Sequence, residues 1–290
     1  MTFASASFHT LLLACTLLLP VTQGLNDGLA LTPPQGWRSW NLFGATVSQQ
    51  LLTEVADAMV SRERSVNGVP TSLADLGYTD VGCDDAWQAQ HSGPGGIGFH
   101  NEAGDPIIDT TKFPNMAAFT AHAHSLNLTA GWYFNNCISA DPSGNLSHFL
   151  GDVAAFRRLG WDNVKLDSCS GQKDVALWAS LFESSGKGVV IENCHNGAYF
   201  PQHSYKPNAP VYCPFHFYRT SVDVEVLYAS IFGINLQSTL EFSRQNLSFP
   251  GCECSFWAHV TCSPSLFSSH PSTTLTPSPP LHSSRRLRVQ

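Results

Sequence analysis

The residues best suited to chemistry are acidic and follow short apolar runs. Asp167 ends the run Asn163-Val164-Lys165-Leu166, and Asp84 and Asp85 follow another apolar run. Side chains two residues apart on a strand face the same side, so we expect Lys165 beside Asp167, favouring the ionised carboxylate that a nucleophile needs. Adjacent carboxylates repel each other unless cations or hydroxyl donors, such as those of a sugar, satisfy them. A surface ion pair and a helix cap remain the alternative interpretations.

Aromatic side chains gather near the same strand ends. They are Trp37, Trp40, Trp87, Trp132, Tyr133 and Tyr218. Each alone is better explained as core, but a ring beside several carboxylates also offers a flat apolar surface for the C–H face of a sugar. Arg219 and Asp223 end the last apolar run, and Asp223 is the only late acid placed to act together with Asp167.

The elements that must position these residues alternate along the chain as short apolar runs and longer amphipathic stretches. The runs predict strands at Gly36–Trp40, Thr79–Asp84, Leu128–Phe134, Asn163–Asp167, Gly188–Asn193 and Phe217–Asp223. The stretches predict helices at Ser48–Val60, Met116–Leu126, Ser147–Leu159, Lys173–Ser184 and Val226–Phe242. Functional residues at the carboxyl ends of the strands favour an α/β barrel. A doubly wound open sheet is the alternative, but no glycine-rich phosphate loop follows the first strand.

Composition and charge exclude some classes of protein. Of 290 residues, 43% are hydrophobic and only 13% charged, which is not the composition of an intrinsically disordered chain. Fifteen Lys and Arg against 22 Asp and Glu make nucleic acid an unexpected partner. Cys252 and Cys254 are too close together for a zinc CxxC motif, so we expect no metal site, and no motif indicates a cofactor.

The two ends of the chain differ from its centre. Residues 1–24 resemble a secretory signal peptide, and residues 253–290 form a Ser/Thr/Pro-rich segment expected to be disordered. Sequons at Asn127, Asn145 and Asn246 and eight remaining cysteines fit an oxidising compartment. We therefore expect a secreted or lysosomal/vacuolar glycoprotein with no membrane span after cleavage of the signal.

Three ordered motifs resemble those of the α-galactosidases of glycoside hydrolase family 27. They are LTPPQGWRSWN at 31–41, DDAWQ at 84–88 and KLDSC at 165–169. The resemblance implies a (β/α)8 TIM barrel followed by a C-terminal β domain, and retaining hydrolysis of terminal α-galactosides. It places the catalytic domain at residues 25–252, with a homodimer expected if the full-length fold forms.

The resemblance also implies roles for individual residues. Asp167 matches the nucleophile and Asp223 the general acid/base of a double displacement. The matched sugar contacts are Trp40, Asp84, Asp85, Tyr133, Lys165, His195, Tyr199 and Arg219. Cys137 with Cys169, and Cys194 with Cys213, match two disulfides.

Departures from the family pattern limit what the resemblance implies. Ala45 and Ala86 stand where a further disulfide is expected. His195 and Ala198 lie at the position that contacts the 2-substituent of the sugar, which leaves α-N-acetylgalactosaminidase activity open. After Cys252 the pattern is lost, so we expect an incomplete barrel of about six βα units without the β domain, and interpret the tail as a mis-spliced sequence. A noncatalytic galactose-binding protein or a nonfunctional fragment is the remaining alternative.

Overall fold

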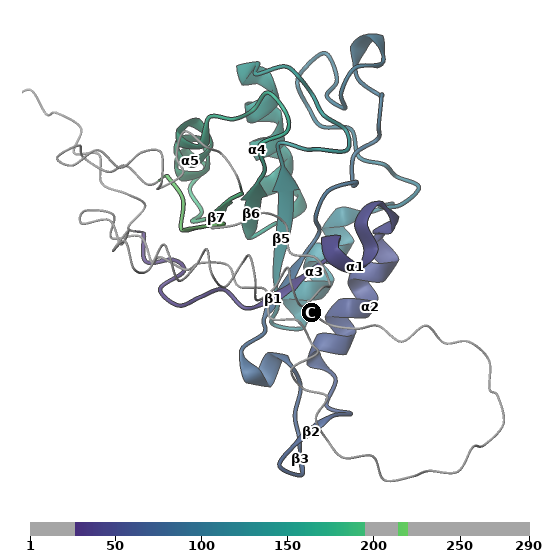
Figure 1. Cartoon of the computed structure of the whole chain (residues 1–290), viewed down its shortest axis with the longest axis vertical. Coiled ribbons are helices and arrows are strands. Elements are labelled where there is room, and N and C mark those ends of the chain that lie inside the picture. The colour runs from purple at the N-terminus through teal and green to yellow at the C-terminus, as the bar shows by residue number, and fades with distance from the viewer. Residues whose placement is uncertain (1–26, 195–213, 220–290) are drawn as a thin grey trace, which may run out of the picture.

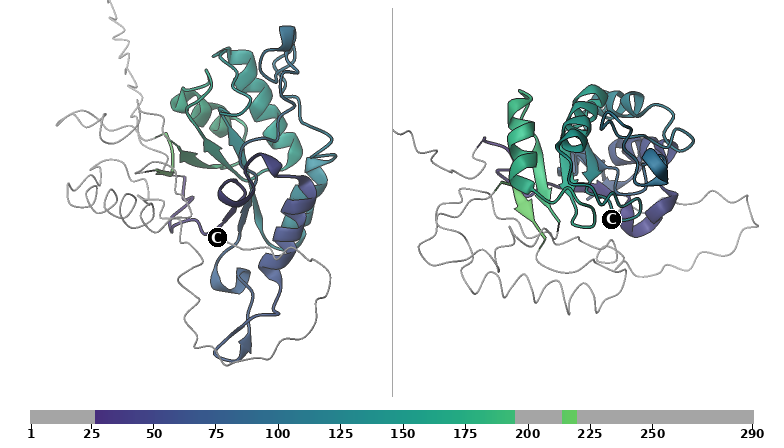
Figure 2. Two further views of the ribbon diagram at one scale, coloured as in Figure 1. Left: turned by 45° about the vertical axis from the view of Figure 1, so that its right-hand side comes forward. Right: turned by 90° about the horizontal axis from the view of Figure 1, so that it is seen from above.

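Six short apolar segments form one parallel sheet. A computed structural model describes residues 27–194 and 214–219, and its strands pair in the order β1-β4-β5-β6-β7-β8. The bounds are β1 (Gly36–Arg38), β4 (Asp80–Gly82), β5 (Thr129–Phe134), β6 (Asn163–Leu166), β7 (Val190–Asn193) and β8 (Phe217–Tyr218). The sheet curls into a half-barrel with helices on its outer face, as Figures 1 and 2 show.

Helices connect the successive strands. Their bounds are α1 (Trp40–Phe43), α2 (Gln49–Val60), α3 (Met116–Ser125), α4 (Leu146–Leu159) and α5 (Val175–Ser184). Side chains of Ser48, Asn115 and Asp174 accept hydrogen bonds from backbone amides in the first turns of α2, α3 and α5. These caps satisfy amide groups that have no partner inside a helix and so define where each helix begins.

The predicted alternation of strands and helices is confirmed over the described residues, and the incomplete parallel barrel with it. Several boundaries differ by a few residues: the strand predicted to reach Trp40 ends at Arg38, with Trp40 beginning α1, and the strand predicted to reach Asp84 ends at Gly82. The Ser39 amide donates to the Gly82 carbonyl, and the chain then turns away from the sheet. The predicted helix Val226–Phe242 lies outside the described residues.

The core lies between the outer face of the sheet and the helices. Trp132 and Phe134 alternate with inward-facing residues along β5 and stack on Trp161 and Trp178, with ring centroids 5.2 and 5.1 Å apart. All four rings are buried. Close packing of large rings contributes strongly to stability, so this layer holds the sheet in its curved form.

The inner face of the half-barrel is polar. Arg38 contacts Asp80 at 3.3 Å and donates a hydrogen bond of 2.6 Å to Asn163. Gly82 and Gly131 make room for this guanidinium, since an added Cβ at either residue would lie 2.3 Å from Arg38 Nη1. The strands therefore carry polar side chains inward and apolar side chains toward the helices.

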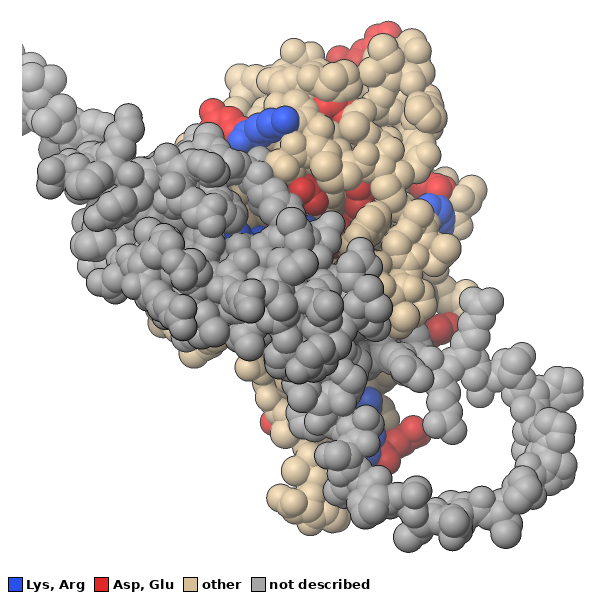
Figure 3. All heavy atoms as spheres, viewed as in Figure 1, with Lys and Arg blue, Asp and Glu red and all other residues tan. Residues whose placement is uncertain are grey.

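Several smaller elements were not predicted. They are the hairpin β2 (Ser65–Val66) and β3 (Val69–Pro70) and the 3-10 turns η1 (Gly44–Thr46), η2 (Ala74–Leu76) and η3 (Pro94–Gly96). Among the described residues, no helix is both long enough and apolar enough to cross a membrane. In Figure 3, the described part of the visible face carries scattered acidic and basic side chains among uncharged ones.

Candidate active site

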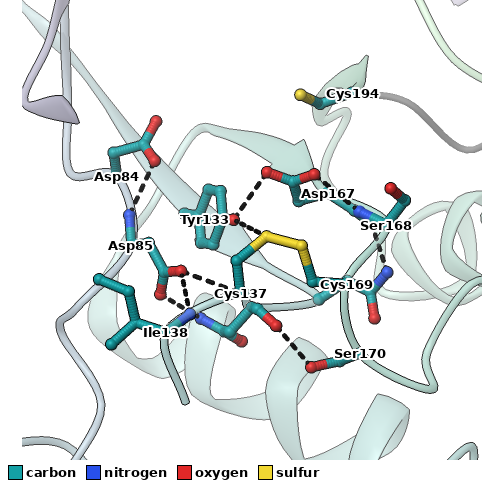
Figure 4. The surroundings of a disulfide bond; sticks show 12 residues. Asp84, Asp85, Tyr133, Cys137, Ile138, Asp167, Ser168, Cys169, Ser170 and Cys194 are labelled. Atoms are coloured by element: carbon teal, nitrogen blue, oxygen red, sulfur yellow. Dashed lines mark hydrogen bonds between the residues drawn. A yellow bond between two sulfur atoms is a disulfide. The ribbon is translucent and has the colours of Figure 1, made fainter. Parts of the chain in front are cut away.

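Asp167 lies directly after β6, at the carboxyl end of the sheet. Its Oδ2 accepts a hydrogen bond of 2.7 Å from the Tyr133 hydroxyl, and its Oδ1 accepts one of 2.8 Å from the Ser168 amide (Figure 4). The side chain is half-buried. Two donors on different oxygens fix the orientation of the carboxylate while leaving part of it exposed, as a reacting group requires.

Lys165 forms its closest ion pair with Asp84 rather than with its neighbour on the strand. Lys165 Nζ lies 2.8 Å from Asp84 Oδ2 and 4.9 Å from the centre of the Tyr133 ring. Burial by itself lowers the pKa of this ammonium, but the charge of Asp84, with smaller contributions from Cys194, Glu192 and Asp167, outweighs burial and raises it. Asp167 therefore contributes to the raised pKa of Lys165, as its predicted proximity implies, but Asp84 is the principal partner.

Asp84 and Asp85 differ in what their oxygens contact. Asp84 accepts from Lys165 and from the Asp85 amide. The buried Asp85 carboxylate accepts four hydrogen bonds, from the amides of Ala86, Cys137 and Ile138 and from the Asn136 side chain. A carboxylate has about four lone-pair positions, so the acceptor capacity of Asp85 is already used to hold the loop after β5.

Tyr133 is buried among three carboxylates on the inner side of β5. Burial raises the pKa of its hydroxyl, and the nearby charges of Asp85, Asp167 and Asp84 raise it further. The phenol therefore stays protonated and remains a hydrogen-bond donor to Asp167. Its oxygen also lies 3.5 Å from Cys137 Sγ.

Other predicted contacts lie around this group. Trp40 is half-buried in α1, after the first strand of the sheet, and Arg219 follows β8 with its Nη1 3.7 Å from Cys194 Sγ. Burial raises the pKa of the Cys194 thiol to about 12. The remaining predicted residues, His195, Tyr199, Cys213, Asp223 and Asn246, lie outside the described residues.

The comparisons with known proteins point to one family. The chain is 31% identical over 185 residues to an α-galactosidase of Cyamopsis tetragonoloba, and 30% identical over 183 residues to one of Coffea arabica. These alignments cover 61% and 60% of this chain. They confirm the resemblance that the three sequence motifs indicate. The chain is α-galactosidase-like.

Solved structures agree with this assignment. The fold matches α-galactosidase I of Mortierella vinacea with a TM-score of 0.52 at 26% identity, covering 69% of this chain and 48% of that one. It also matches the fold of an α-galactosidase of Saccharomyces cerevisiae, with a TM-score of 0.54 over 70% of this chain and 42% of that one. No protein-family model matches. The α-galactosidase-like chain spans less than half the length of the two plant relatives, 41% and 44%.

One predicted disulfide of this α-galactosidase-like chain is confirmed. Cys137, after β5, is bonded to Cys169, after β6, with a Cα–Cα separation of 4.8 Å. The bond lies beside Asp167 in Figure 4. It joins the two loops that follow the strands carrying Tyr133 and Lys165. The pairing of Cys194 with Cys213 stays a prediction, because Cys213 lies outside the described residues.

Within residues 27–194 and 214–219, two groups of side chains have the composition of a metal site. Cys137, Asp167 and Cys169 lie close together, but both sulfurs are in the disulfide and are not thiolate ligands. His100 and His148 lie beside Asp141, with their rings stacked 4.1 Å apart and 17° from parallel. The lone pair of an imidazole nitrogen lies in the plane of its ring, so two stacked rings cannot both direct lone pairs at one ion.

Sequence reasoning missed several buried polar residues near the candidate site. His100 and Asp141 lie in loops, where no periodic pattern identifies them, and both His100 and Gln172 contact Asp152 on α4. Glu192 is buried in β7 opposite Lys165 in the strand register. An acid inside the apolar run Val189-Val190-Ile191-Glu192 was the signal that could have identified it.

Proposed function

We propose that the chain carries the glycone side of a retaining α-galactosidase site, with Asp167 as its nucleophile. The observation that carries this proposal is the Asp167 carboxylate, which is half-exposed and oriented by Tyr133 and Ser168 at the carboxyl end of a barrel strand. Catalytic groups of such barrels come from strand ends of this kind. The similarity to α-galactosidases of two plants supports an α-galactoside as the substrate.

The proposed reaction is a double displacement at the anomeric carbon. Asp167 attacks this carbon and forms a glycosyl ester as the bond to the leaving oxygen breaks, and a general acid protonates that oxygen. Water, deprotonated by the same group, then displaces Asp167 and releases galactose. The family resemblance assigns the acid/base role to Asp223, which lies outside the described residues. Asp84 and Lys165 are the nearest described groups for binding sugar hydroxyls.

Replacement of Asp167 by Asn tests the proposal directly. The amide is nearly isosteric but is a poor nucleophile, so turnover of a nitrophenyl α-galactoside should fall by at least about 10⁴-fold. Galactose binding, measured by calorimetry, should remain detectable. Glu183→Gln makes the same acid-to-amide change at an exposed position on α5 and serves as the control.

Other results of these measurements would support a different function. Retained turnover in Asp167→Asn removes Asp167 from the nucleophile role. Galactose binding without turnover in the unaltered chain instead supports a noncatalytic sugar-binding protein. Activity on a 2-acetamido substrate in parallel distinguishes an α-N-acetylgalactosaminidase.

We also propose that the chain folds in an oxidising compartment on the secretory route. The Cys137–Cys169 disulfide supports this, since such bonds persist in secreted and lysosomal proteins. The sequon residues Asn127 and Asn145 are both exposed and therefore accessible to a glycan. A loss of mass after treatment with an N-glycosidase, mapped to these two residues, tests the proposal.

A further inference from the structure

The side chain of Lys112 joins two segments at the carboxyl end of the sheet. Its Nζ donates hydrogen bonds of 3.0 Å to the Ala45 carbonyl, in η1, and 3.2 Å to the Ala86 carbonyl, after β4. Ala45 and Ala86 are also the positions at which the sequence lacks the expected disulfide. Among the described residues no ion pair of Lys112 within 4 Å is found, although its charge helps to lower the pKa of Asp109, and the ammonium hydrogen-bonds to these two carbonyl groups.

The backbone around Lys112 is itself held in place. The Lys112 amide donates to Asp109, its carbonyl accepts from Gln49 at the start of α2, and the Asp109 amide donates to the Trp87 carbonyl. The ammonium is therefore presented from a fixed loop rather than from a free surface chain. Because the backbone is already ordered, binding of the two carbonyl groups requires only the side-chain torsions of Lys112 to be fixed.

Ala86 needs such support because of its backbone conformation. Its φ is +76°, in a region that residues with a Cβ rarely adopt. Its amide donates 2.7 Å to Asp85 Oδ1, while its carbonyl accepts from Lys112. Both polar backbone groups of this buried residue are thus engaged, which holds a strained conformation in place.

We propose that Lys112 is a positioning residue that holds the Asp84–Asp85 segment in the shape required for binding the sugar. This inference rests on the proposed function. Asp84 contacts Lys165, and Asp85 anchors the loop that carries Cys137, so movement at Ala86 displaces both carboxylates. Lys112 touches neither Asp167 nor Lys165, and its effect is transmitted through the backbone of residues 84–86.

The first test is Lys112→Met in the full chain, which keeps the aliphatic stem and removes the three donors. Two quantities are measured: hydrogen exchange of a peptide spanning residues 82–88, and KM and kcat for a nitrophenyl α-galactoside. We expect faster exchange and a KM raised about 10-fold with kcat changed less than about 3-fold, because lost ground-state contacts weaken substrate and transition state alike.

Matched variants separate positioning from general destabilisation. Lys187 precedes β7, at the opposite end of the sheet, and pairs with Asp162. Lys187→Met removes this pair and should leave both the hydrogen exchange of residues 82–88 and the KM unchanged. Lys112→Arg, which keeps the charge and the donors, should restore most of the loss. Ala45→Cys with Ala86→Cys, added to Lys112→Met and oxidised, should slow exchange again by joining the same segments covalently.

The possible outcomes decide the proposal whether or not the chain hydrolyses galactosides. Unchanged exchange in Lys112→Met overturns the inference even if the enzyme is active. Faster exchange with unchanged KM in an active enzyme overturns the positioning role. If the unaltered chain has no turnover, the proposed function fails. Hydrogen exchange of residues 82–88 in Lys112→Met, and its slowing by the added cysteine pair, still determine whether Lys112 holds the segment.

Discussion

Tyr133 connects the candidate nucleophile to the rest of the site. Its hydroxyl donates to Asp167 Oδ2 and lies against Cys137, while its ring faces the Lys165 ammonium. Because burial and the surrounding carboxylates raise the pKa of the phenol, it keeps its proton over the whole working range of pH. Tyr133 therefore acts as a permanent donor that fixes the direction of one Asp167 oxygen.

Tyr133→Phe should lower kcat/KM for an α-galactoside by about 30-fold. A hydrogen bond to a charged group contributes about 1.5–3 kcal/mol, which corresponds to a loss of this size. Tyr78→Phe serves as the control, because it removes a hydroxyl from a half-buried tyrosine that packs against the core. Equal kinetics for the two variants would show that the Tyr133 hydroxyl does not orient the nucleophile.

The loops that follow the strands are joined to one another by polar contacts rather than by packing alone. Besides Asp85 and the disulfide, His100 in the loop after β4 contacts Asp141 in the loop after β5 at 2.8 Å and Asp152 on α4 at 3.1 Å. Gln172 binds the second oxygen of Asp152 at 2.8 Å, and the ring of His148 stacks on His100. The imidazole is fully buried, so its loss removes one partner from each of two buried carboxylates.

His100→Gln should lower the free energy of unfolding by about 3 kcal/mol at pH 6, as expected when one partner of a buried pair is removed. Burial by itself lowers the pKa of His100, but Asp152 and Asp141 outweigh it and the pKa is raised. The stabilisation is therefore complete below about pH 6.5, the unfolded value, and is lost as the pH rises through the folded-state pKa.

Urea unfolding of His100→Gln and the unaltered chain between pH 6 and 9 measures this dependence. The difference between the two should shrink as the pH rises. His124→Gln, at a largely exposed histidine paired with Asp162, should cause a much smaller loss at every pH. A constant difference for His100→Gln would indicate that the imidazole is neutral in the folded protein.

At the scale of the whole molecule, polar contacts inside the half-barrel join the first four strands of the sheet order. Arg38 on β1 contacts Asp80 on β4 and Asn163 on β6, and Thr129 on β5 donates to Asp80. Burial raises the pKa of Asp80, against the opposing charge of Arg38. The guanidinium therefore neutralises a carboxylate that the sheet has removed from water.

Arg38→Met should destabilise the fold by about 2 kcal/mol in urea unfolding, less than for a fully buried pair because part of the guanidinium is exposed. Arg62→Met breaks the exposed ion pair with Asp75 and should have a much smaller effect, because solvent screens that pair. If the two variants lose stability equally, the interior pair contributes no more than a surface one.

The sequence by itself was sufficient for the order of strands and helices and for placing the motif residues Asp84, Lys165 and Asp167 at strand ends. These follow from local patterns: apolar periodicity marks the elements, and residues two apart on a strand share a face. The Cys137–Cys169 bond was expected from the family resemblance and not from such a pattern. The family resemblance added the expected roles, since short motifs in a fixed order identify a family more specifically than composition does.

Only the tertiary structure decided which of these groups contact one another. Lys165 pairs with Asp84 across β5, His100 meets two acids 41 and 52 residues away, and Lys112 reaches Ala45 from 67 residues away. No periodic pattern encodes such contacts, because the intervening loops follow no repeat and their path depends on the packing of the sheet and its helices. The folded structure sets the distances between buried charges and how far each is removed from water, and these two factors decide which charges form an ion pair.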